Sequence, residues 1–257
     1  MAEQQSGGAH TSRTMLLADL SSVLAHCDPT STLEQYRKAV IESNVAGKES
    51  LSSRQRTFRY LRELYALDLA VPVFRALLRL WRREREGRPV VALLCAASRD
   101  AALSATAEAV LQRLEGLPVT SSDLATAVDA RYPGAYSPSI RNKIGRNALS
   151  SWTQAGYLTR DGRGPAIRSH VDPSPAAVAM ALVLGTRGGL SGERLFTSDM
   201  AQMLDAPIST LHDRAHDASR KGWLGYRSLG SVTEVDVSAL MAEPSDPRLP
   251  ITDGDAR

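Results

Sequence analysis

The chain has 257 residues, of which 43% are hydrophobic and 23% charged, and its formal net charge is +3. This length holds one large domain or two to three small ones, and the composition is that of an ordinary globular protein. Aromatic residues make up only 5%, so Leu, Val and Ala must build the core, which favours helices over a β-sandwich. The mild positive charge suits a nucleic-acid partner only if it is concentrated on one surface.

The apolar segments of the sequence are too short for a membrane protein. The longest, around 90–97 and 176–185, reach about half of the roughly 20 residues that a bilayer requires. The amino-terminal residues are polar and have no signal-like apolar run. Cys27 and Cys95 are far apart and form no CxxC pair, which is typical of a reducing compartment. We therefore expect a cytoplasmic protein without a membrane partner.

In chain order, residues 1–12 are rich in polar residues and Gly, and we expect them to be disordered. Apolar spacing then predicts a bundle of about six helices over 13–115, with Pro72 early in one of them, where proline costs least. The tail at 242–257 is rich in Pro, Gly and charge, and we expect it to be disordered too.

A ten-residue phrase occurs twice after the predicted bundle. "SSDLATAVDA" at 121–130 returns as "TSDMAQMLDA" at 197–206, with five identical letters and further conservative pairs. We interpret "SSD" and "TSD" as helix N-caps and the apolar letters that follow as a packing face. The repeated phrase is therefore predicted to be scaffold, and it marks the start of two similar units.

Each copy is followed by a turn, a longer amphipathic helix and two short strands joined by a glycine turn. Gly156 and Gly222 follow the longer helices, where a left-handed cap is expected, and an aromatic residue and Leu come next. Helix, turn, helix and β-hairpin is the winged helix-turn-helix order. We therefore predict a mainly α protein: an N-terminal helical bundle followed by a first winged-helix module at 116–185 and a second at 186–241.

The longer helix of the first module has a cationic face. At about 100° per residue, Ile140, Ile144, Ala148, Trp152 and Ala155 fall on one side, together with Arg141. The opposite side carries no carboxylate, and its candidate DNA-binding residues are Ser139, Asn142, Lys143, Arg146 and Ser150. Arg160, Arg163 and Arg168 of the predicted wing are candidates for phosphate contacts. The plainer alternative is a polar helix face that is only solvated.

The corresponding helix of the second module is less suited to DNA. Its exposed side places Asp213 and Asp217 beside His216 and Arg220, and carboxylates repel phosphates. We expect this module to serve packing, dimerisation or a partner protein. His212 and His216 have a spacing that can hold zinc, but no third ligand is evident, so we expect no metal site.

Signals for an enzyme are poor, and we assign no catalytic residue and no cofactor. "GTRGGLSGE" at 185–193 lacks the GK[ST] of a phosphate loop and is better read as an interdomain loop. The "RREREGR" run at 82–88 is typical of a solvated helix end, with an auxiliary phosphate patch as the alternative.

Three phrases, "RYLRELYALDLAVPVFRALLRLW" (59–81), "ALLCAASRDAAL" (92–103) and "RNALSSWTQAGYL" (146–158), resemble the BrxA-type proteins of BREX phage-exclusion systems. The similarity spans roughly residues 50–240. The resemblance implies a small, mostly helical, non-enzymatic component of a defence system that methylates host DNA and blocks phage replication. It also implies a methyltransferase, an ATPase and a phosphatase-like protein as partners.

Together these patterns predict a non-enzymatic accessory protein of a BREX-type system that contacts double-stranded DNA through the first winged helix. One alternative is a winged-helix transcriptional regulator, which would prefer a single operator and span half-sites as a dimer. The other is an interaction scaffold whose winged helices dock partner subunits.

Overall fold

The structure is a computed structural model that describes residues 8–230 and 232–243, and it confirms a mainly helical fold. The described helices are η1 (Ala9–Thr11, a 3-10 helix), α1 (Leu17–His26), α2 (Leu33–Ile41), α3 (Leu51–Tyr65), α4 (Pro72–Arg83), α5 (Arg88–Arg99), α6 (Ala101–Ser104), α7 (Ala107–Leu111), α8 (Ser121–Arg131), α9 (Pro138–Gln154), α10 (Pro175–Arg187), η2 (Gly192–Thr197, 3-10), α11 (Asp199–Gln202), α12 (Ile208–Arg220) and α13 (Ser238–Met241). The strands are β1 (Pro118–Val119), β2 (Leu158–Thr159), β3 (Ala166–Arg168), β4 (Gly225–Leu229) and β5 (Val232–Asp236).

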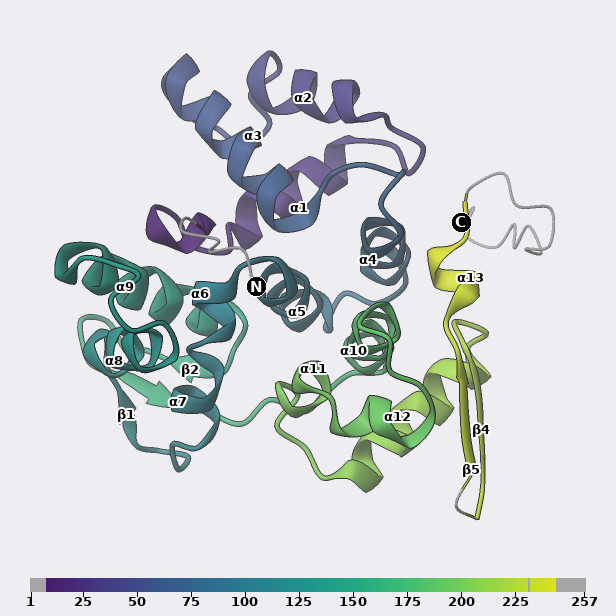
Figure 1. Cartoon of the computed structure of the whole chain (residues 1–257). Helices are drawn as coiled ribbons and strands as arrows, with labels where there is room; N and C mark the ends of the chain where they lie inside the picture. The colour runs from purple at the N-terminus through teal and green to yellow at the C-terminus, as the bar shows by residue number, and fades with distance from the viewer. Residues whose placement is uncertain (1–7, 231, 244–257) are drawn as a thin grey trace.

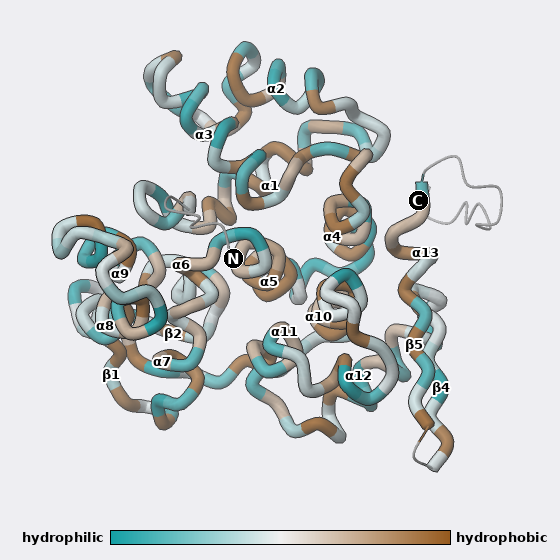
Figure 2. Tube along the Cα trace, viewed as in Figure 1, coloured by the Kyte–Doolittle hydropathy of each residue, from teal (hydrophilic) through white to brown (hydrophobic). Residues whose placement is uncertain are grey.

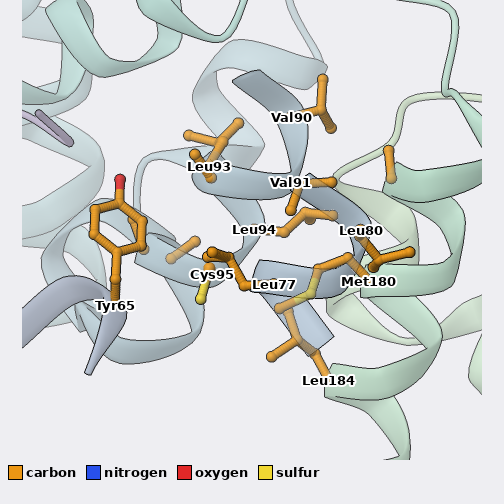
Figure 3. Close-up of a cluster of buried hydrophobic side chains, with 14 of the residues drawn as sticks. Tyr65, Leu77, Leu80, Val90, Val91, Leu93, Leu94, Cys95, Met180 and Leu184 are labelled. Carbon is orange, nitrogen blue, oxygen red and sulfur yellow. The ribbon is translucent and has the colours of Figure 1, made fainter. Parts of the chain in front are cut away.

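Helix α5 lies at the centre of the molecule and packs against α3, α4, α9 and α10 (Figure 1). All eight residues from Val90 to Ala97 are buried, because the helix has neighbours on every side. Figure 3 shows Leu94 beside Leu77 and Leu80 of α4 and Met180 of α10. Figure 2 shows the same concentration of apolar residues on α4, α5 and α10, while the outer helices are more polar. The predicted core of aliphatic residues is thus built around one apolar helix.

The predicted bundle contains one helix more than expected in its described part. The additional helix arises because the helical sequence that follows α5 breaks between α6 and α7. Asp100 caps α6 by accepting from the backbone N–H groups of Ala102 and Leu103. Thr106, at the break, donates to the carbonyl of Leu103 and accepts a hydrogen bond from the Trp152 indole at 2.8 Å. The break therefore receives a buried side chain from α9.

The expected domain boundary at 185/186 falls inside α10, which ends at Arg187. Residues Ala176 to Gly185 of this helix are all buried. Helix α10 packs against α4 and α5 of the bundle and against α11 and α12 of the second repeat. It therefore joins the second repeat to the core and does not belong to the first repeat.

Each copy of the repeated phrase is accompanied by a small antiparallel sheet, and β1 of the first sheet precedes its copy. The first has the order β1-β3-β2, with Val119 opposite Ala166 and Thr159 opposite Ile167. The second is the hairpin β4-β5, with Leu229 opposite Val232 at its tip. Figure 1 shows this hairpin extending from the body of the molecule.

Residues 8–12 were expected to be disordered, and the structure corrects this. They form η1, in which Ala9 and His10 are fully buried against α9, α3 and α6. The rest of the two predicted disordered ends, 1–7 and 244–257, lies outside the described residues. Ala242, in the expected tail, accepts a hydrogen bond from Arg79 of α4 at 2.8 Å.

Candidate nucleic-acid interface

Helix α9 is positioned by a defined start, a close contact in its middle and a glycine at its end. Ser137 caps the first turn by accepting from the backbone N–H of Ile140 at 3.4 Å. In the middle of the helix, Gly145 lies directly against the backbone of Ser121 in α8, and a side chain there would collide with the Ser121 carbonyl. Gly156 ends the helix with φ of +90°, and Gly222 does the same after α12 with φ of +69°. Both predicted left-handed caps are confirmed.

The caps of the repeated phrase differ from the expectation in one of the two copies. Ser198 caps α11, as predicted, by accepting from the N–H of Ala201 at 3.2 Å. In the first copy, Thr120 is the cap, one residue before "SSD". Asp123 completes a capping box by accepting from the Thr120 N–H at 2.8 Å. Asp123, from a position inside α8, thus stabilises the first turn of this helix.

The predicted apolar side of α9 faces the core along most of the helix. Ile144, Ala148 and Trp152 are fully buried and Ala155 is 2% exposed. Ile140 is 39% exposed, because it lies in the first turn. Arg141, which the spacing placed on the apolar side, forms an ion pair with Asp129 of α8.

Most of the candidate DNA-binding residues are accessible. Ser139, Asn142, Lys143, Arg146, Arg160 and Arg163 are exposed, and Ser150 is half-buried, accepting from the Gln154 amide at 3.2 Å. Within the described residues, no carboxylate lies within ion-pair distance of any of the four cations in this set. The turn between β2 and β3 does carry one exposed carboxylate, Asp161, between its two arginines.

Arg168 is the exception, and its assignment to phosphate binding is wrong. It is 4% exposed and forms an ion pair with Asp205, which lies between α11 and α12. The guanidinium also donates to the carbonyl of Tyr157 at 3.3 Å and lies 5.6 Å from the centre of the Tyr157 ring. Arg168 therefore holds the first repeat to the second and is not available to a ligand.

Helix α12 presents the mixed charge that its sequence predicts. Asp213, His216 and Arg220 are exposed, and Asp217 pairs with Arg214 at 3.6 Å. His212 is engaged elsewhere: its Nδ1 lies 2.8 Å from the Tyr226 hydroxyl and its Nε2 3.0 Å from Glu193. Its ring also stacks on Phe196, with 4.0 Å between the ring centres. In the part of the chain that the structure describes, no three metal-ligating side chains gather.

A buried polar cluster that sequence reasoning missed fixes the N-terminal segment to α9. His10 Nδ1 lies 2.9 Å from Asp100 and His10 Nε2 lies 2.8 Å from Ser151 Oγ. Burial alone would raise the pKa of the Asp100 carboxyl, but hydrogen bonds and charge from His10 and backbone N–H groups hold this pKa below its usual value.

The order Ser, His, Asp matches a nucleophilic triad, but the surroundings do not. All three residues are at most 1% exposed. Ser151 Oγ also accepts from the Met15 N–H at 2.9 Å and lies 3.0 Å from the Asn147 carbonyl, so no side of the hydroxyl is free for a substrate. The cluster is therefore a structural clasp. Its members are separated by 90 and 141 positions, so no local pattern signals it.

No family model and no curated protein matched this sequence. None of the described helices is by itself long and apolar enough to cross a membrane. Only Arg88–Arg99 and Ala101–Leu111 taken together reach that length, and they are bent by 112°.

Proposed function

We propose that the protein binds double-stranded DNA through α9 and the β2–β3 turn, acting as a non-enzymatic accessory component of a BREX-type phage-defence system. The observation that carries the proposal is the outer face of α9. It has two exposed cations, Lys143 and Arg146, and no carboxylate anywhere along the helix. Arg and Lys contact phosphates and guanine, and Asn142 on the same face suits adenine or the backbone.

We interpret residues 116–171 as a winged helix. Strand, helix, helix, strand and strand follow one another as β1, α8, α9, β2 and β3, and the last strand lies in the middle of the sheet. In this interpretation α9 is the recognition helix and the β2–β3 turn, with Arg160 and Arg163, is the wing that contacts adjacent phosphates. Helices α10, α11 and α12 with the β4–β5 hairpin form a second, related unit.

Charge reversal on α9 tests the proposal. We expect the purified full chain to bind duplex DNA with little sequence preference and with affinity that falls steeply as salt is added. The double variant Lys143→Glu, Arg146→Glu should lose this binding. Arg220→Glu, an exposed arginine on α12, is the matched control and should bind as the parent does. Equal binding by the parent and the double variant, with both folded, would overturn the α9 interface.

The BREX assignment is supported by the resemblance of the three sequence phrases, and it would place the protein in the cytoplasm beside a methyltransferase, an ATPase and a phosphatase-like protein. In a host that carries the complete system, replacement of the gene by the double variant should reduce protection against phage. Unchanged protection against phage would show that defence does not depend on DNA binding by α9. A footprint at one operator near its own promoter would instead indicate a transcriptional regulator.

The second unit supports an additional role as a protein-docking scaffold. Its helix α12 exposes a carboxylate, and the tip of the β4–β5 hairpin exposes Leu229 by 86% and Val232 by 65%. Apolar side chains at a protruding tip suit contact with another protein. Co-purification of neighbouring gene products with the parent, and its loss in Leu229→Ser, Val232→Ser, would support this role.

A further inference from the structure

Segment η1 lies between α9 and α3, and it connects the proposed DNA-binding helix to the helical bundle (Figure 1, purple). On the α9 side, the side-chain amide of Asn147 donates to the His10 carbonyl at 2.8 Å. Asn147 directly follows Arg146 in the sequence. On the α3 side, the guanidinium of Arg13 lies 5.9 Å from the centre of the Tyr60 ring. The cationic face of α9 and the middle of α3 are therefore joined by a segment that buried hydrogen bonds hold in place.

Tyr60 organises two arginines at this junction. Arg59 lies 4.6 Å from the centre of the Tyr60 ring and donates to the Tyr60 hydroxyl at 2.7 Å. Burial would raise the pKa of Tyr60, but hydrogen bonds and the charges of Arg59 and Arg13 lower it below its usual value. Arg59 is exposed and Arg13 half-buried. The two guanidinium groups are thus pre-oriented, which reduces the entropy cost of binding an anion.

The surroundings of these arginines leave their charge available. Within the described residues neither Arg13 nor Arg59 lies within ion-pair distance of a carboxylate. Glu63, one helical turn after Arg59, is half-buried. Burial and the charge of Asp100 raise its pKa, although the charges of Arg59, His10 and Arg99 act in the opposite direction. Arg99 donates to the carbonyl of Glu63 at 2.7 Å and adds another exposed guanidinium at this end of α3.

We infer that Arg13 and Arg59 form a second phosphate-binding surface, so that duplex DNA lies across η1 and touches the helical bundle as well as α9. This inference rests on the proposed function of α9. A duplex fits both surfaces because it carries negative charge continuously along its length. The buried clasp of His10 then has a functional consequence: it fixes the position of Arg13 relative to Lys143 and Arg146.

The test compares Arg59→Gln and the double variant Arg13→Gln, Arg59→Gln with the full-length parent on duplex DNA over a range of salt. The slope of log affinity against log salt should fall by about 1 for each phosphate that the variant no longer neutralises. Arg220→Gln removes one charge on α12 and should leave the slope unchanged. Arg59→Gln guards against a folding defect, since this side chain is exposed and its removal leaves η1 in place.

A hydroxyl-radical footprint gives an independent readout. The parent should protect a stretch of duplex, and in the Arg59 variants this protected stretch should become shorter at a single end. The double variant Lys143→Glu, Arg146→Glu should lose the whole footprint. If the Arg59 variants keep the parent slope and footprint, the inference is overturned and the α9 interface stands. If the Arg59 variants bind duplex DNA as the parent does but bind polyglutamate less well than the parent, the patch serves an acidic protein. This result would also overturn the inference. A parent that binds no duplex would overturn both proposals.

Discussion

Gly145 of α9 packs directly on the carbonyl of Ser121 in α8. A side chain at this position would collide with backbone on the facing helix, which has no flexible end that could move aside. The contact sets the depth at which α9 sits on α8, and therefore how far Lys143 and Arg146 project from the molecule.

The first prediction follows from this contact. Gly145→Ala should destabilise the protein although alanine is the better helix former. Helix propensity favours alanine by about 1 kcal/mol, whereas overpacking of a tight contact costs about 1–3 kcal/mol or more. Thermal unfolding measures the balance, and Asn142→Ala, exposed on the same helix, is the control. An increase in stability for Gly145→Ala would mean that α8 and α9 are not packed so closely.

The buried clasp predicts an acid-sensitive contribution to stability. Because the folded pKa of Asp100 is depressed, this contribution is complete above the unfolded pKa of about 3.9 and disappears as the pH falls through the lower folded value. Asp100→Asn keeps an acceptor for the cap of α6 but removes the negative charge and replaces the oxygen that accepts from the His10 backbone N–H, so it should cost about 1–3 kcal/mol near neutral pH.

The measurement is chemical unfolding of the parent and Asp100→Asn at a series of pH values. Their stabilities should converge as the pH falls below about 4. Parallel curves with a constant difference would show that the charge of Asp100 does not contribute.

Arg168 and Arg163 should separate stability from DNA binding. Arg168→Met leaves Asp205 without its buried partner and should cost about 2–3 kcal/mol, less than a fully buried pair because Asp205 is 29% exposed. Its folded fraction should bind DNA as the parent does. Arg163→Gln, exposed at the β2–β3 turn, should unfold like the parent and weaken DNA binding. If Arg168→Met weakened DNA binding without a loss of stability, Arg168 would be part of the DNA-binding interface.

The bond between Trp152 and Thr106 gives a prediction for the core of the α9 contact. Thr106→Val has a similar shape but leaves the buried indole N–H without an acceptor, which costs about 1–3 kcal/mol. Thr106→Ser keeps the hydroxyl and should recover most of this stability in unfolding experiments. Equal stabilities for the valine and serine variants would show that the hydrogen bond contributes little.

The sequence predicted the helical class, the repeat and the faces of α9 because these depend on local spacing. The buried side of this helix, from Ile144 to Ala155, follows directly from the 3.6-residue period. The ion pair of Arg168 cannot be predicted in this way. Alternation in β3 places Arg168 on the buried side with Ala166, but it does not indicate which carboxylate will be its partner. Asp205 is 37 positions away, and only the folded chain brings it to the guanidinium.

The same limit explains the N-terminal segment. Residues 8–12 are all small or polar, a composition typical of disorder, and no local feature marks His10 as buried. Its order comes from Asp100 and Ser151, which sequence spacing cannot connect. The boundary predicted at 185/186 falls inside α10 for a related reason: a continuous apolar run does not reveal which neighbours will cover it.

The link between His10 and Ser151, 141 positions apart, also sets an order of events during synthesis. The η1 segment is synthesised before its binding partners Asp100 and Ser151, so it cannot dock until α9 has emerged. Until then Arg13 has no fixed place, and closing so long a loop is an entropically costly step that slows folding. The proposed phosphate-binding surface can therefore form only after α9 has been synthesised.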